Sequence, residues 1–254
     1  MGTVVLRNCL VVLLAALSFA GAQMASVPAG SFAVDSGVAQ GVRTSRRTVE
    51  LSAFLLDKNE VAKAQYDSCV AAGVCTAAHY DDGACVAWNG REFRCVKVPR
   101  AMIDAQYPVV CVSWQQARQY CAFKGKKLPS EAQWEYAALA GRSMAAYAWG
   151  NQPPDANRCA QSRDMHPKKV GTYTSNPWGL YDMTGNVWEW VNDRYQSDYF
   201  ESSEPRDPQG PDAGMYRVVR GGGWYSGIEQ LKIKNRMWFD PNTGEVSIGF
   251  RCAK

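Results

Sequence analysis

The stretch GNVWEW, residues 185–190, places Glu189 between Trp188 and Trp190. A carboxylate between two bulky rings can point inward and offer oxygen to a hard cation, together with backbone carbonyls that irregular chain leaves unpaired. The alternative is a buried glutamate that accepts hydrogen bonds from the backbone at a turn. The six residues alone leave both interpretations open.

Cysteine usage favours disulfides over a zinc site. Nine cysteines occur, with only two histidines and no C-x2-C pair, so the usual zinc spacing is missing. Cys9 lies in the apolar first segment, which leaves an even number in the rest of the chain. Those eight are Cys69, Cys75, Cys85, Cys95, Cys111, Cys121, Cys159 and Cys252.

The first 22 residues are typical of a secretory signal, with Arg7, an apolar run over residues 9–17 and an A-x-A site at residues 20–22. A retained N-terminal anchor is the alternative. Cleavage would leave residues 23–254 with no transmembrane segment, and we expect an exported protein, periplasmic, cell-surface or secreted. The mature chain would carry 27 basic and 24 acidic residues, an excess too small to indicate nucleic-acid binding.

The elements that position these residues fall into one predicted domain over residues 23–254. Residues 26–37 indicate a strand after a turn, and Ala62, Tyr66, Cys69 and Val70 mark one face of a helix that ends at Gly73. Residues 74–108 show no period and predict a disulfide-held loop. A short strand within residues 107–113 is expected next.

Two further helices follow this strand. Ser113 is expected to cap a helix that ends at Gly125, and Ser130 with Gln133 forms a capping box for the next helix. Glu131 is expected to serve the N-terminal turn of that helix, where negative charge suits the dipole. Beyond Tyr147 regular periodicity is nearly absent, and long irregular segments in a compact domain are typically functional.

Seven stretches in order along the chain resemble one known family. They are VPAGSF (27–32), NEVAKAQY (59–66), YPVVCVSWQQARQYCAFKGKKLPSEAQWEYAALAG (107–141), YAWGN (147–151), NPWGLYDMTGNVWEWVND (176–193), RVVRGGGW (217–224) and IGFRCAK (248–254). On these motifs the chain resembles the formylglycine-generating enzyme, or sulfatase-modifying factor, family. The resemblance implies an α+β, C-type-lectin-like fold with a small twisted antiparallel sheet, two main helices and much irregular chain.

The resemblance also implies structural calcium. The matching positions are the side chains of Asp182 and Glu189 and the carbonyls of Gly185 and Val187. A second calcium site of the family would map to Asn157 and the Arg158 carbonyl, with Asp164 as a further candidate ligand. Trp188 matches a ring that lines the family's substrate cleft.

One disulfide, Cys121 with Cys252, is implied by the resemblance. It would close a loop of about 130 residues and contribute about 4 to 5 kcal/mol in the chain-entropy model. The remaining pairs follow from proximity in sequence alone, which favours Cys69 with Cys75 and Cys85 with Cys95. That pairing leaves Cys111 and Cys159 over.

The chain departs from the family's enzymes where those hold copper. Their two reactive cysteines correspond here to Ser226 and Leu231, and neither side chain is a soft sulfur ligand for Cu(I). A related branch holds iron with three histidines, whereas only His79 and His166 occur. We therefore expect no copper and no formylglycine-generating oxidase activity.

Three classes of function remain. The first is a binding module that holds a peptide, protein or glycan in a cleft lined by Trp188, Trp224, Tyr225, Ser226 and Trp238, with the variable protein of a diversity-generating retroelement as a special case. The second is an oxidoreductase of the superfamily with altered chemistry, acting on a peptide or siderophore. The third is a structural part of an envelope complex.

Overall fold

The computed structural model describes residues 23–35, 38–39, 42–43, 46–160 and 166–254. The predicted signal segment and Asp164 lie outside these residues. Within the described ranges, no helix has the length and apolar character needed to cross a membrane.

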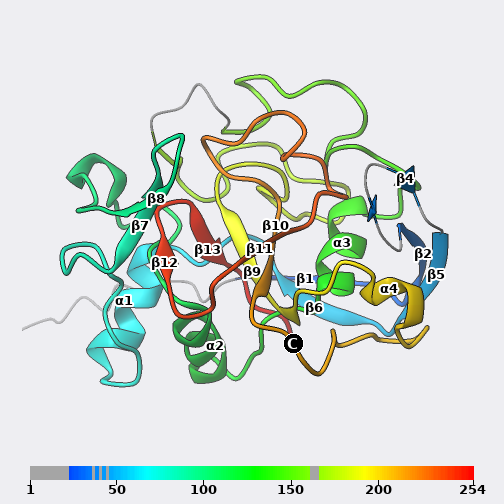
Figure 1. Cartoon of the computed structure of the whole chain (residues 1–254), viewed down its shortest axis with the longest axis horizontal. Coiled ribbons are helices and arrows are strands. Elements are labelled where there is room, and N and C mark those ends of the chain that lie inside the picture. Colours follow the sequence, from blue (N-terminus) through cyan, green and yellow to red (C-terminus); the bar gives the residue numbers. More distant parts are fainter. Residues whose placement is uncertain (1–22, 36–37, 40–41, 44–45, 161–165) are drawn as a thin grey trace, which may run out of the picture.

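A four-stranded sheet lies at the centre, in the order β11 (Met237–Phe239), β10 (Arg217–Arg220), β9 (Trp188–Arg194) and β13 (Ile248–Phe250) (Figure 1). β9 is antiparallel to β10 and parallel to β13. Trp190 of β9 is fully buried, and its indole N–H donates to the Val112 carbonyl at 3.0 Å. This ring therefore fills the core.

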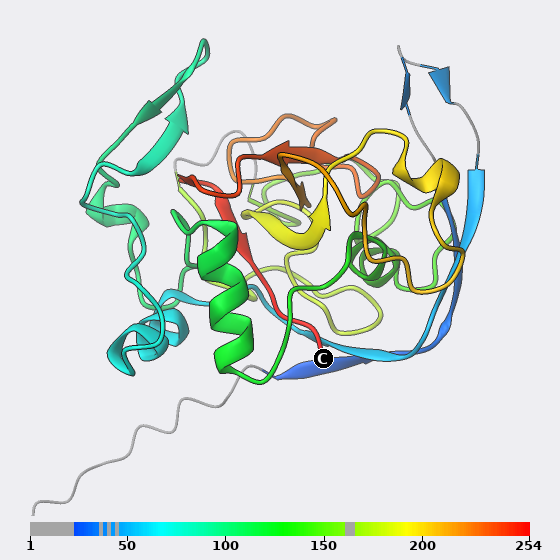
Figure 2. The same cartoon turned by 60° about the horizontal axis from the view of Figure 1, so that its bottom comes forward.

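The N-terminal strands form a separate ribbon along one side of the molecule (Figure 2). β1 (Met24–Val27) pairs with β6 (Phe54–Asp57), β2 (Gly30–Asp35) with β5 (Arg46–Leu51), and β3 (Val38–Ala39) with β4 (Val42–Arg43). Their buried side chains, among them Val49, Leu51 and Leu56, join one core cluster with the helix that follows Ser130.

Local capping residues define the helices. α2 (Trp114–Phe123) begins after Ser113, and α3 (Glu131–Leu139) begins after Ser130, which exchanges the two hydrogen bonds of a capping box with Gln133. Both predicted N-termini are confirmed. The other helical elements are α1 (Lys63–Ala71), the single turn α4 (Tyr199–Ser202) and the 3-10 turn η1 (Arg100–Met102).

Glu131 lies in the first turn of α3, as expected, and it takes part in further contacts there. The backbone N–H of Glu131 donates to Asp193 at 2.8 Å, so a carboxylate from β9 serves the start of α3. The Glu131 side chain is fully buried and pairs with Arg220 and Arg236. Burial raises its pKa, but the two guanidinium groups outweigh that effect and hold the pKa below its usual value. The pair with Arg220 ties α3 to β10.

Residues 74–108 contain regular structure that the sequence analysis missed. β7 (Cys85–Trp88) and β8 (Phe93–Cys95) form an antiparallel hairpin, which projects from the body in Figure 2. β12 (Gly244–Glu245), far along the chain, pairs in parallel with β7. The short strand expected within residues 107–113 is in turn reduced to one isolated bridge, Pro108 opposite Ala62.

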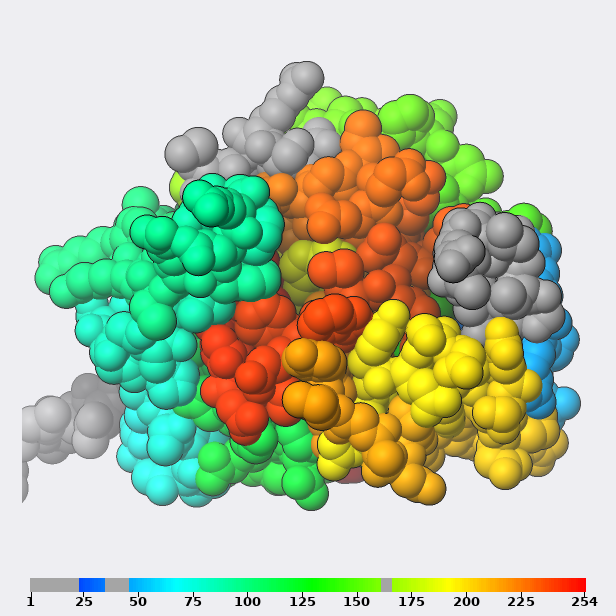
Figure 3. All heavy atoms as spheres, viewed as in Figure 1, coloured from blue at the N-terminus to red at the C-terminus, as the bar shows by residue number. Residues whose placement is uncertain are grey.

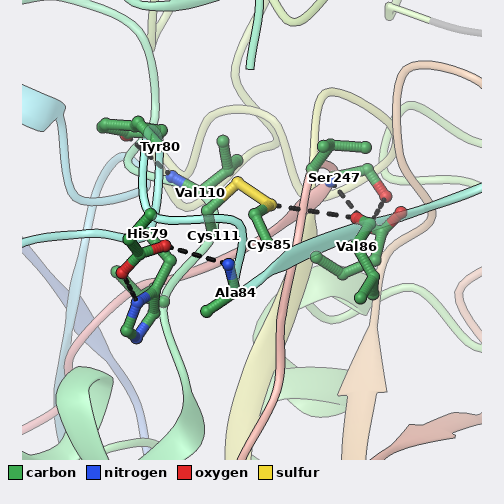
Figure 4. The surroundings of a disulfide bond; sticks show 12 residues. His79, Tyr80, Ala84, Cys85, Val86, Val110, Cys111 and Ser247 are labelled. Atoms are coloured by element: carbon green, nitrogen blue, oxygen red, sulfur yellow. Dashed lines mark hydrogen bonds and ion pairs between the residues drawn. A yellow bond between two sulfur atoms is a disulfide. The ribbon is translucent and has the colours of Figure 1, made fainter. Parts of the chain in front are cut away.

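Two of the disulfides follow the expected pairs and one does not. Cys69 is bonded to Cys75, and Cys121 to Cys252. The Cys85–Cys95 prediction was wrong, because Cys85 is bonded to Cys111 at the base of the hairpin (Figure 4). The ladder explains the difference: Cys95 lies opposite Val86, and its side chain is exposed, whereas the side chain of Cys85 is buried.

Removal of a disulfide should cost more stability when the bond closes a longer loop, because the cost rises with the logarithm of loop length. Replacing both Cys121 and Cys252 by alanine removes a bond between cysteines 131 residues apart in sequence. The corresponding change at Cys69 and Cys75 removes a bond between cysteines 6 residues apart. We expect losses of about 5 and about 2 kcal/mol respectively in the free energy of unfolding, measured in denaturant under oxidising conditions. The two pairs are matched controls because both lie in the interior. An equal loss, or a larger one for the short loop, would contradict the expectation.

Candidate functional site

A cleft of about 380 Å³ opens between the hairpin and the C-terminal part of the chain. Figure 3 shows the hollow near the centre of the face, between the teal hairpin and the orange and red segments. We name it the aromatic cleft because six aromatic rings line it: Trp88, Phe93, Trp188, Tyr225, Trp238 and Phe239. Its other lining residues are Val219, Ser226, Gln230, Met237, Glu245, Ser247 and Ile248.

The hairpin supplies one wall of the aromatic cleft. Trp88 and Phe93 face each other across the end of the hairpin with ring centroids 5.1 Å apart, and Phe93 lies 5.1 Å from Phe239 of β11. About half of the surface of Trp88 and of Phe93 is exposed. Contacts with Phe239 and the Cys85–Cys111 disulfide therefore hold two exposed rings in place over the cleft.

Glu245 and Ser247 form the polar part of the lining. Both oxygens of the buried Glu245 carboxylate accept hydrogen bonds, Oε1 from the Tyr225 hydroxyl and Oε2 from Ser247 N and Oγ at 2.7 Å each. Burial raises the pKa of Glu245, and these hydrogen bonds act in the opposite direction. The carboxylate is thus fixed in orientation by its neighbours.

The two residues expected at the positions of the family's copper cysteines, Ser226 and Leu231, are buried in the packing. Ser226 lines the cleft but is almost fully buried, and its Oγ accepts from Gly223 N at 2.9 Å. Leu231 is fully buried beside Gly222, where a Cβ would lie only 2.7 Å from the leucine side chain. Gly222 also has a φ of +78°, so this turn requires glycine.

The aromatic cleft contains most of the residues expected from the sequence. Trp188, Tyr225, Ser226 and Trp238 line it together, whereas Trp224 is not among the lining residues and packs against Tyr225 with centroids 4.8 Å apart. The sequence analysis missed the hairpin rings and Glu245. The dipeptide Asn89-Gly90 between two short runs was a usable hairpin signal, whereas nothing local indicates the role of Glu245.

Glu189, the residue first singled out, is fully buried and held by side chains. Its Oε1 accepts from Arg251 Nη2 at 2.7 Å, and its Oε2 accepts from Arg251 Nε and from the Trp134 indole, each at 2.8 Å. Arg251 also donates to the carbonyls of Asp57, Lys58 and Tyr181. The hydrogen-bond donors to Glu189 are therefore the side chains of Arg251 and Trp134, and not backbone N–H groups at a turn.

Two more buried carboxylates lie close to Glu189. Glu60 accepts from the Asn186 amide at 2.6 Å and from Val187 N at 3.2 Å, and Asp182 Oδ2 accepts from Gly171 N at 2.6 Å. Burial raises the pKa of Asp182 to about 6 and that of Glu60 well above its usual value, and the neighbouring carboxylates add to the rise in both. Among the described residues, Asp182 Oδ1 has no hydrogen-bond partner although it is buried.

These groups meet part of the requirement for calcium. Three carboxylates share one buried cation, Arg251, and one carboxylate oxygen lacks a donor, so a hard cation would find both charge and oxygen there. Side chains alone do not make a metal site: in the part of the chain that the structure describes, no group of three His, Cys, Asp or Glu could hold a metal ion. Backbone carbonyls such as those of Gly185 and Val187 would have to complete it.

The second expected calcium site has less support. Asn157 and Arg158 lie in a turn in which Asp155 Oδ1 accepts from Asn157 N, and Asp155 Oδ2 accepts from the Arg158 guanidinium at 2.6 Å. The nearest carboxylate is thus already engaged by a cation. Asp164 lies outside the described residues.

Comparisons with known proteins agree with the motifs. The model of the sulfatase-modifying factor enzyme 1-like domain matches residues 15–254. A Streptomyces coelicolor protein named formylglycine-generating enzyme is 31% identical over 274 residues, which cover 89% of this chain and 87% of that protein. A Chlamydia trachomatis protein named serine/threonine-protein kinase Pkn1 is 36% identical over 237 residues. That match covers 91% of this chain but only 38% of the Chlamydia protein.

Solved structures share the fold over nearly the whole length. PvdO from Pseudomonas aeruginosa superimposes with a TM-score of 0.73 at 25% identity, covering 91% of this chain and 93% of PvdO. Treponema denticola variable protein 1 gives a TM-score of 0.70 at 23% identity, covering 91% and 94%. The expected C-type-lectin-like α+β fold is confirmed.

Arg251 should be among the most sensitive residues for stability. Replacing Arg251 by methionine leaves buried carboxylates without their cation, and we expect a loss of about 3 to 5 kcal/mol in the free energy of unfolding in urea. The matched control is Arg206→Met, since Arg206 forms an exposed ion pair with Glu50 and should lose about 1 kcal/mol or less. Equal losses in the two variants would show that the buried pair has no special role.

Proposed function

The chain belongs to the sulfatase-modifying factor enzyme 1-like family, and we propose that it is a ligand-binding member in which the copper oxidase chemistry has been lost. The ligand is a peptide, a protein or a glycan, held in the aromatic cleft. The single observation that carries this proposal is the cleft itself, where six rings from distant segments converge on a site of small-molecule size.

Exposed rings on a fixed frame support recognition. Trp238 keeps 43% of its surface exposed while it packs on Tyr216 with centroids 4.3 Å apart. A ring that is already held in place loses little conformational freedom when a ligand binds, and large aromatic side chains contribute strongly at binding sites. The hairpin rings Trp88 and Phe93 have the same character.

The chemistry at the family's copper positions argues against oxidation. A serine hydroxyl is a hard, weakly acidic ligand, and leucine offers no donor atom, so Ser226 and Leu231 cannot replace two thiolates for Cu(I). Ser226 Oγ is also engaged with Gly223 N. Among the described residues that line the cleft, none is a cysteine or a histidine.

Export to an oxidising compartment forms part of the proposal. Three disulfides join cysteines among the described residues, and such bonds persist in exported proteins. The expected signal segment over residues 1–22 would provide the route.

Structural calcium is a second element of the proposal, in addition to export. The Asp182 side chain and the carbonyls of Gly185 and Val187 would hold the ion together with Glu189, whose Oε1 keeps a lone pair beside its hydrogen bond from Arg251. The ion would balance the excess of buried negative charge. The unpartnered Asp182 Oδ1 supports this assignment. The ion would stabilise the irregular segment before β9 and take no part in ligand chemistry.

Ligand binding should depend on the exposed rings of the cleft. We expect Trp238→Ala and Trp88→Ala each to weaken binding of the strongest hit from a peptide and glycan array by about tenfold or more, measured by calorimetry. Val74→Ala, which changes an exposed apolar residue outside the cleft lining, should leave affinity unchanged. Cleft variants that bind as well as the unmodified protein would refute the assignment.

Metal content should separate calcium from copper. The purified protein should bind calcium and not Cu(I), and should not convert a Cys-x-Pro-x-Arg peptide. Calcium should raise the melting temperature more at pH 8 than at pH 5. The reason is that Asp182, with a pKa of about 6, is protonated at pH 5 and is an ionised carboxylate at pH 8. Asp182→Asn should reduce the calcium effect. Stoichiometric copper with peptide turnover would overturn the proposal.

A further inference from the structure

The aromatic cleft carries charge of only one sign. Among the described residues that line it, none is a lysine, an arginine or a histidine, and Glu245 is the one acidic residue. A phosphate or carboxylate entering the cleft would meet this carboxylate with no compensating cation, which costs free energy in a partly desolvated site. A ligand group that bears positive charge would meet complementary charge.

The backbone fixes Glu245 relative to the aromatic wall. Glu245 lies opposite Val86 in the parallel pairing of β12 with β7, the strand that ends at Trp88. The Glu245 carbonyl accepts from Cys111 N at 3.1 Å, and Cys111 is bonded to Cys85 at the start of β7. Figure 4 shows this disulfide, with Val86 and Ser247 close by. The strand pairing and the disulfide therefore hold Glu245 and the hairpin rings in fixed positions relative to each other.

The hydrogen bonds of Glu245 restrict the kind of cation. Oε2 already accepts two bonds from Ser247, and Oε1 accepts one from Tyr225. A carboxylate oxygen has two lone pairs, so the pattern leaves a single acceptor position on Oε1. A guanidinium group binds a carboxylate through two parallel hydrogen bonds, one to each oxygen, and this geometry is blocked here.

Other acceptors in the lining are also engaged. Ser226 Oγ accepts from Gly223 N, and Gln230 Oε1 accepts from Gly227 N at 3.0 Å. A primary ammonium group brings three donors, more than the one position left on Glu245, and would give up hydrogen bonds to water on entering the cleft. An alkylated ammonium needs few or no hydrogen bonds, because it is attracted by the faces of aromatic rings and by a nearby negative charge.

We propose that the aromatic cleft binds an alkylated ammonium group, the chemistry shared by a methylated lysine side chain and a choline-type molecule. The group would contact the hairpin rings and Trp238, with Glu245 supplying the balancing charge. This inference rests on the proposed binding function of the same cleft and names the chemical class of its ligand.

The test uses the full exported chain and compares choline with 3,3-dimethylbutanol, the uncharged molecule of nearly the same shape. Tryptophan fluorescence and calorimetry report binding to the cleft. We expect choline to bind at least about tenfold more tightly than the neutral molecule. A parallel titration compares choline with acetylated trimethyllysine methylamide. Tighter binding of the lysine derivative indicates a methylated side chain as the ligand, and tighter binding of choline indicates a small molecule.

Two matched variants isolate the role of Glu245. Glu245→Gln should remove the preference for choline while the neutral molecule binds as before, and Glu229→Gln, which changes an exposed acid paired with Lys232, should keep the preference. Trp238→Leu, a change at a partly exposed ring, should weaken choline binding about fivefold or more without unfolding the protein.

The outcomes separate this inference from the broader proposal. Equal affinity for choline and the neutral molecule, or a preference that survives in Glu245→Gln, would mean that Glu245 only holds Tyr225 and Ser247 in place. Absence of binding by every ammonium probe, while an array ligand still binds in a Trp238-dependent manner, would overturn the ammonium assignment and leave the binding function intact.

Discussion

The pairing of the C-terminal segment with the rest of the chain is the constraint on which the structure depends. β12 pairs with β7, β13 pairs with β9, Arg251 neutralises Glu189, and Cys252 is bonded to Cys121. Within nine residues the segment thus joins the hairpin, the central sheet, the buried carboxylates and α2. The same segment carries Glu245, so the interactions that close the fold also set the lining of the cleft.

This arrangement accommodates serine and leucine at the two positions expected to correspond to the family's copper cysteines. Leu231 fills space beside Gly222, and Ser226 closes the turn that begins at Gly223, so both positions contribute to packing. The cleft beside them keeps its rings and one carboxylate. Disulfides, buried ion pairs and strand pairing hold this frame without reactive cysteines at these positions.

Sequence-based prediction succeeded for interactions between residues close in sequence and mostly failed for those between distant residues. The caps at Ser113 and Ser130 involve residues within one helical turn, so the local sequence was sufficient. The family motifs predicted the fold and the Cys121–Cys252 pair as well. Pairing of Cys85 with Cys111 could not be inferred from proximity, because it depends on how the hairpin docks. The partner of Glu189 lies 62 residues away, and the role of Glu245 arises only when β12 meets β7.

Native mass spectrometry of the protein taken from its own compartment tests the central claim most directly. The account predicts a calcium-loaded chain with intact disulfides that retains a non-covalent ligand, lost on mild activation and reduced in a Trp238→Ala variant. The account would be contradicted by a chain that carries copper and by a Trp238→Ala variant that retains the non-covalent ligand as well as the unmodified protein does.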